Sequence, residues 1–95
     1  MAKIIKLSKP LKINGQAVNE VELDFNKITG TTLLAAEREV RMLGEESMSV
    51  FVSMQYQAIV ASKIIGVPVE DITELPGNDF KNIVLSVANF LLTPA

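Results

Sequence analysis

Apolar and polar residues alternate along the first 25 positions in a way that predicts strands. Lys3–Leu7 is a short apolar segment interrupted by a lysine, and Val21–Phe25 alternates strictly between apolar and acidic side chains. A period of two places the apolar residues on one face of a half-buried strand. The pair Asn14-Gly15 lies between these runs, and such a pair favours the positive φ angles of a type I′ turn. The sequence therefore predicts a β-hairpin over roughly residues 3–25.

The rest of the chain carries apolar residues at the spacing of helices. Three main helices are predicted over about residues 32–43, 47–65 and 79–92, and a short one over about 68–75. The fold class that follows is α+β, with an N-terminal hairpin and then helices. A chain of 95 residues is expected to form one domain over residues 1–95.

Residues at the predicted helix ends support these boundaries. Gly44 and Gly66 stand where glycine commonly ends a helix. Ser47 follows two acidic residues, and this arrangement is typical of a helix start. Asn78 or Asp79 is expected to cap the last helix, directly after the break made by a proline and a glycine.

The predicted second helix is apolar on several faces. Residues 47–62 contain no charged side chain, but a membrane-spanning helix needs about 20 predominantly apolar residues. The serines and glutamines of this run favour a core or interface helix instead. Because so small a chain can hardly cover such a helix on every side, the pattern suggests a protein partner or a homo-oligomer. Met42, Met48 and Met54 are open to two interpretations, as core residues or as an adaptable groove.

Composition narrows the function classes. The chain has no cysteine and no histidine, which excludes thiolate chemistry, disulfides and histidine general bases. The net charge is −2, so no strong positive field favours nucleic acid. The apolar residues at the start are divided by lysines and form no secretion signal. We expect a cytoplasmic protein that is not an enzyme, has no cofactor and does not insert into a membrane.

Two charged clusters allow a functional interpretation and a structural one. Glu70, Asp71, Glu74 and Asp79 contain acidic groups that could hold a metal ion, but their spacing matches no cation loop. Acidic residues in first helical turns explain them better, and no metal is expected. The lysines between residues 3 and 12 could contact nucleic acid. A solvated strand face, whose lysines prevent edge-to-edge aggregation, is the favoured interpretation.

The order of elements and the residues at their junctions resemble a known family. The segments that carry the likeness are Leu33–Glu37, Ile64–Pro68, Val69–Leu75, Asp79-Phe80 and Asn89–Leu92. They are similar to the tail assembly chaperones of long-tailed bacteriophages, in the group named for the E, 41 and 14 tail proteins. The resemblance implies a cytoplasmic protein of an infected or lysogenic bacterium. It implies that the chain binds the tape measure protein and holds it soluble while tail tube subunits are recruited.

The resemblance and the residue pattern favour the same mechanism, in which apolar helix surfaces accept a client. The side chains expected to form the partner-binding surface come from the second and last predicted helices: Phe51, Met54, Tyr56, Phe80, Val84, Val87 and Phe90. The alternative is a structural tail or head–tail component, an oligomeric adaptor that uses the same helices for self-assembly.

Overall fold

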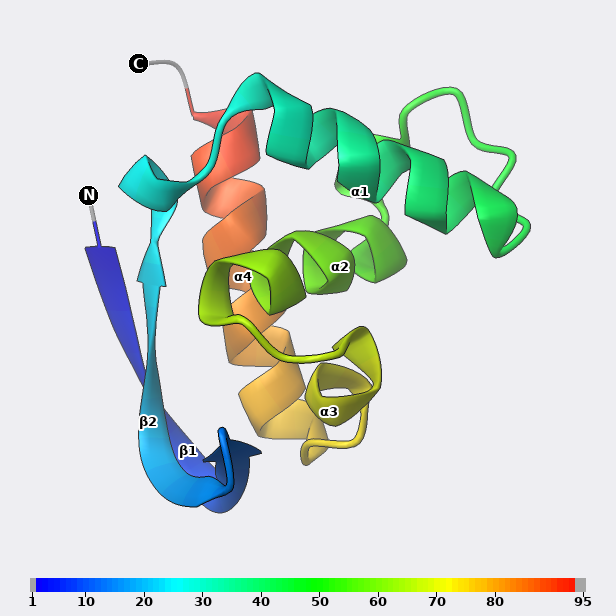
Figure 1. Cartoon of the computed structure of the whole chain (residues 1–95). Helices are drawn as coiled ribbons and strands as arrows, with labels where there is room; N and C mark the ends of the chain where they lie inside the picture. Colours follow the sequence, from blue (N-terminus) through cyan, green and yellow to red (C-terminus); the bar gives the residue numbers. More distant parts are fainter. Residues whose placement is uncertain (1, 94–95) are drawn as a thin grey trace.

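The chain begins with an antiparallel hairpin, as the sequence predicts. In the computed structural model, which describes residues 2–93, β1 spans Ala2–Ile13 and β2 spans Gln16–Asp24 (Figure 1). Asn14 and Gly15 join them with φ angles of 54° and 81°. These are the positive values that a two-residue turn needs to match the right-handed twist of the strands. The predicted hairpin is confirmed.

A bulge interrupts the pairing in the middle of the hairpin. Lys6 lies opposite Glu20, and the next paired residue of β1 is Leu11, opposite Val18. The first strand therefore advances five positions while the second advances two. Pro10 lies in this interval, where its missing N–H costs no ladder hydrogen bond. The bulge leaves backbone groups of β1 free to contact another element.

Four helices follow the hairpin. The helices are α1 at Gly30–Met42, α2 at Met54–Ile65, α3 at Val69–Thr73 and α4 at Gly77–Leu92, and short 3-10 turns occupy Phe25–Lys27 and Val50–Val52. The helix α2 contacts α1, α3, α4 and β2, and Figure 1 shows it crossing in front of α4 with α1 on one side and α3 on the other. The α+β class, three long helices and one short helix are thus as predicted.

The second helix starts later than predicted. It begins at Met54, after Ser53, whose hydroxyl accepts the Tyr56 N–H at 3.3 Å. The expected cap Ser47 instead accepts the Ser49 N–H at 3.1 Å. Serine often bonds its own neighbouring backbone in this way, which stabilises a turn in competition with a helix. The start predicted at residue 47 was therefore wrong, and residues 43–49 form a loop.

The last helix starts earlier than predicted. It begins at Gly77, and Pro76 occupies the N-cap position with an extended ψ of 150°. Asn78 and Asp79 are therefore inside the helix, and the prediction that one of them caps it was wrong. Asp79 still lies in the first turn, where the helix dipole favours a negative charge. Its carboxylate, however, bonds to the hairpin.

The Asp79 carboxylate joins the last helix to the first strand. Its two oxygens accept the Ser8 N–H at 3.1 and 3.0 Å, and the Ser8 hydroxyl donates to Oδ2 at 3.0 Å. Ser8 lies within the bulge of β1, which explains why its N–H is available. Asp79 is 3% exposed, so these bonds replace the water that a carboxylate normally binds.

The core lies where the inner face of the hairpin meets α2 and α4. Its fully buried side chains include Leu23, Ile59, Ile72 and Ile83. Aliphatic residues dominate it, and Phe25 is the one phenylalanine among the buried residues of the described chain. Within residues 2–93, no helix has both the length and the apolar character needed to cross a bilayer.

Candidate functional site

The seven residues predicted to bind a partner fall into three groups. Tyr56, Val84 and Val87 are at most 4% exposed and belong to the core. Phe80 is partly buried and packs against that core. Phe51, Met54 and Phe90 are exposed. In this conformation only the last group, with the edge of Phe80, can offer apolar surface to a partner.

Exposed apolar side chains gather along one stretch of the chain. Between the end of α1 and the start of α2, six large apolar residues are exposed, and we call them the Met42–Met54 surface: Met42, Leu43, Met48, Phe51, Val52 and Met54. Met48 is 98% exposed and Met42 is 85% exposed. Apolar side chains so open to water are a common mark of protein-binding surfaces.

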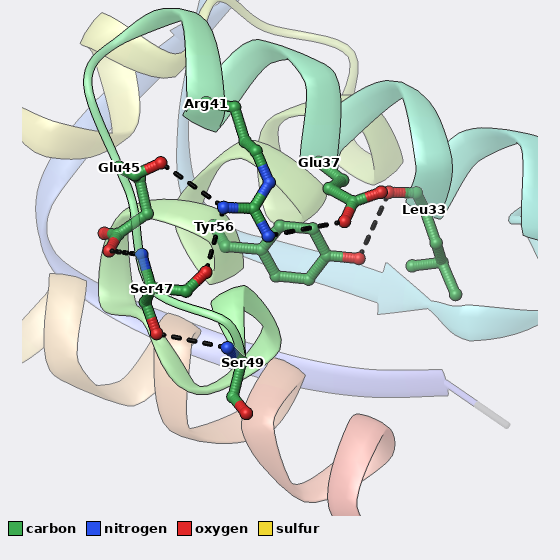
Figure 2. A network of polar contacts seen from close by, with 7 residues as sticks. All are labelled: Leu33, Glu37, Arg41, Glu45, Ser47, Ser49 and Tyr56. Carbon is green, nitrogen blue, oxygen red and sulfur yellow. Dashed lines mark hydrogen bonds and ion pairs between the residues drawn. The ribbon is translucent and has the colours of Figure 1, made fainter.

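Arg41 holds the loop that carries part of this surface (Figure 2). Its guanidinium donates to the carbonyl oxygen of Ser47 at 2.9 Å and to that of Glu45 at 3.4 Å, and lies 3.7 Å from the Glu37 carboxylate. The loop adds two bonds of its own, from Ser47 N–H to Glu45 and from Ser49 N–H to Ser47. Arg41 therefore pairs with Glu37 on its own helix and also bonds the backbone of the loop.

Tyr56 joins the two helices that this loop connects. Its hydroxyl donates to the Leu33 carbonyl at 3.2 Å, which joins α2 to α1 (Figure 2). Burial raises the pKa of the Tyr56 phenol above its usual 10, and the nearby Glu37 carboxylate raises it further. The phenol therefore stays protonated and remains a donor at all physiological pH values. The exposed apolar residues thus lie beside two helices that this hydrogen bond joins.

Replacing Arg41 by alanine is expected to loosen the loop without unfolding the protein. The Arg41–Glu37 pair is largely exposed, so the free energy of unfolding should fall by less than about 1 kcal/mol. Amide hydrogen exchange of residues 45–49 should become roughly tenfold faster, because the opening of a loop is governed by its local bonds. The matched control is Arg38→Ala, since Arg38 is exposed on the same helix. Equal exchange in both variants would show that Arg41 does not hold the loop.

Part of the apolar surface of α4 is covered by another residue of the chain. The ring of Phe90 stacks on Phe25, with centroids 4.5 Å apart and planes within 4°. Phe90 remains 39% exposed, so only part of the ring is open to a partner. Leu85 and Leu92 on the same helix are 52% and 56% exposed. Because Phe90 already packs on Phe25 of the 3-10 turn that follows β2, the Met42–Met54 surface is the better candidate.

The acidic residues of the predicted cluster lie in different parts of the fold. Glu70 and Asp71 lie in the first turn of α3, while Asp79 bonds Ser8. Within the part of the chain that the structure describes, no three acidic side chains are placed to hold a metal ion. All four lysines between residues 3 and 12 are exposed.

Comparison with known proteins assigns the chain to a family. The model of the family described as phage tail assembly chaperone proteins, E, or 41 or 14, matches residues 4–92. The matched range includes nearly the whole hairpin and all four helices. No curated protein and no solved structure matches the chain. Since the match covers almost all of the sequence, the chain belongs to the phage tail assembly chaperone family of proteins E, or 41 or 14.

Proposed function

We propose that this chaperone binds the phage tape measure protein in the host cytoplasm and keeps it soluble until tail tube subunits assemble on it. Family membership supports a role in tail assembly. We infer that the client binds at the Met42–Met54 surface, because six large apolar side chains remain exposed there. The client would be a long helical protein with apolar stripes, which is the kind of ligand that an apolar surface accepts.

The chemistry of this surface suits a client whose sequence varies along its length. Methionine is unbranched and flexible, so Met42, Met48 and Met54 can adapt to differently shaped apolar side chains. Phe51 adds a rigid aromatic contact, the type of residue that often dominates binding energy. The surface is thus able to hold many segments weakly, and the tail tube protein can later displace it.

Co-expression with the tape measure protein tests this proposal. The wild-type chain should keep that protein soluble and elute with it. The double variant Met48→Asp/Phe51→Asp should lose most of this effect, because burying two charged side chains against an apolar client costs free energy. The matched control is Leu34→Asp, which charges an apolar side chain that is 60% exposed but lies outside the Met42–Met54 surface. Thermal melting should show that both variants remain folded.

Two results would contradict the proposal. One is an unchanged yield of soluble tape measure protein with the double variant. The other is a change in the mass of the chaperone alone, measured by light scattering, with no change in the client. That second result would identify the surface as an oligomer interface and would favour the structural adaptor.

A further inference from the structure

A second surface is an open groove between the first strand and the last helix. One wall is the segment Lys3–Lys6 of β1, and the other is formed by Asn82, Leu85, Ser86 and Asn89 of α4. The helix residues follow the spacing i, i+3, i+4 and i+7, which places them on one face. The groove has a volume of about 430 Å³. It shares no residue with the Met42–Met54 surface.

The strand wall of this groove is an unpaired sheet edge. The described residues form one two-stranded sheet, so β2 covers only one edge of β1. A free edge carries backbone N–H and C=O groups that another extended chain can bond. Where β1 bulges, α4 already bonds the backbone of this strand, through Asp79 and Ser8. From Lys3 to Lys6 the edge of β1 has no such bond to α4, and the groove lies along it. This stretch of four strand residues spans roughly 10 Å.

The charge of the groove is positive. Lys3 and Lys6 are exposed, and no acidic residue lines the groove. Among residues 2–93 the ion pairs are Arg41 with Glu37 and Lys63 with Glu39. Glu20 and Glu22 lie opposite Lys6 and Ile4 in the hairpin, outside the lining of the groove, and Glu20 forms no ion pair with Lys6. The groove is therefore complementary to carboxylates.

The uncharged lining fits a short peptide. Ile4 and Leu85, which are 57% and 52% exposed, contribute apolar surface from the two walls. Asn82 and Asn89 offer amide groups that both donate and accept hydrogen bonds. Side chains of an extended peptide alternate in direction. One apolar side chain can therefore enter beside Ile4 and Leu85, and peptide residues three positions apart can point to the two faces of β1 that carry Lys3 and Lys6.

We propose that this groove binds an extended acidic segment of another polypeptide, which adds to the free edge of β1 and places carboxylates beside Lys3 and Lys6. The proposal is independent of the proposed function, because it uses no residue of the Met42–Met54 surface. It gives the chaperone a second docking site, so that it can contact two polypeptide segments at once.

An acetylated and amidated hexapeptide with glutamates at its second and fifth positions and valines elsewhere is the probe, because residues three apart point to opposite faces of a strand, as Lys3 and Lys6 do. Titrated into the ¹⁵N-labelled full chain, it should shift the backbone resonances of Lys3–Lys6 and the side-chain amides of Asn82 and Asn89. Binding should weaken roughly tenfold in the Lys3→Glu/Lys6→Glu variant, because both charge contacts become repulsive. The matched control, Lys9→Glu/Lys12→Glu, changes the net charge equally on the same strand but lies outside the groove, and should bind as the wild type does.

Several results would overturn the proposal. Absence of saturable shifts up to about 5 mM peptide would show that the groove binds no such segment, since even weak strand addition gives millimolar affinity. Equal binding of a lysine–valine peptide would exclude charge recognition. Equal binding of a peptide N-methylated at alternate amides would exclude addition to the strand edge. Shifts of the groove residues with a thymidine oligonucleotide but not with the peptide would assign the lysines to nucleic acid.

Discussion

Replacing Asp79 by alanine is expected to lower the free energy of unfolding by about 1.5–3 kcal/mol, because a partly buried, charge-assisted hydrogen-bond network would be lost. The carboxylate is 3% exposed and accepts from both the N–H and the hydroxyl of Ser8. Removing it leaves the Ser8 N–H without a protein acceptor and breaks the link between α4 and β1. Urea unfolding followed by circular dichroism measures the change.

A companion variant separates the two bonds to Ser8. Ser8→Ala removes only the hydroxyl donor and keeps the backbone N–H, so it should cost about 1 kcal/mol. The double variant should cost less than the sum of the two, since both changes remove the same hydroxyl bond. Additive costs, or a loss below about 0.5 kcal/mol for Asp79→Ala, would show that Asp79 does not join α4 to β1.

Replacing Ile59 by alanine is expected to cost about 3–4 kcal/mol, because it opens a cavity at the centre of the molecule. Ile59 is 1% exposed and lies on α2, the helix that contacts α1, α3, α4 and β2. For a domain whose total stability is of the order of 5–15 kcal/mol, that loss is severe. Thermal and urea unfolding should both move to milder conditions.

Met54→Ala on the same helix is the matched control. Met54 is 61% exposed, so its truncation should change the free energy of unfolding by less than about 0.5 kcal/mol. The same variant should weaken client binding, because Met54 belongs to the Met42–Met54 surface. If both variants destabilise equally, Met54 is buried in solution and is not part of an exposed surface.

Local patterns predicted the elements whose stability is mainly local. The alternation of Val21–Phe25 and the turn pair Asn14-Gly15 determine the hairpin, since strand faces and turn angles depend on neighbouring residues. Gly44 and Gly66 end α1 and α2 with φ angles of 98° and 90°. These features need no contact from a distant part of the chain.

Features that depend on distant contacts were missed. Asp79 was expected to cap a helix, and only the bulge of β1 reveals its partner Ser8. Ser47 was expected to cap the second helix, but Ser53 caps it, while the Ser47 carbonyl accepts a bond from Arg41 of α1. Sequence spacing shows that a residue is able to cap but not which bonds it makes in the fold.

The side chains expected to bind a partner differ in their exposure. Phe51, Met54 and Phe90 are exposed, whereas Tyr56, Val84 and Val87 are core residues. Periodicity separates apolar from polar faces, but on a helix that is apolar nearly all round it cannot show which side faces the core. Met48 was open to two interpretations, and its 98% exposure favours the groove over the core.

The bond between Ser8 and Asp79 also has a consequence for synthesis on the ribosome. Asp79 follows Ser8 by 71 residues, and bacterial ribosomes add about 5–20 residues per second, so roughly 4–14 s separate the two partners. During that interval the hairpin lacks its anchor to α4, and an isolated two-stranded hairpin is only marginally stable in water. The groove between β1 and α4 therefore forms only after α4 has been synthesised, and a nascent chain that stops before α4 lacks it.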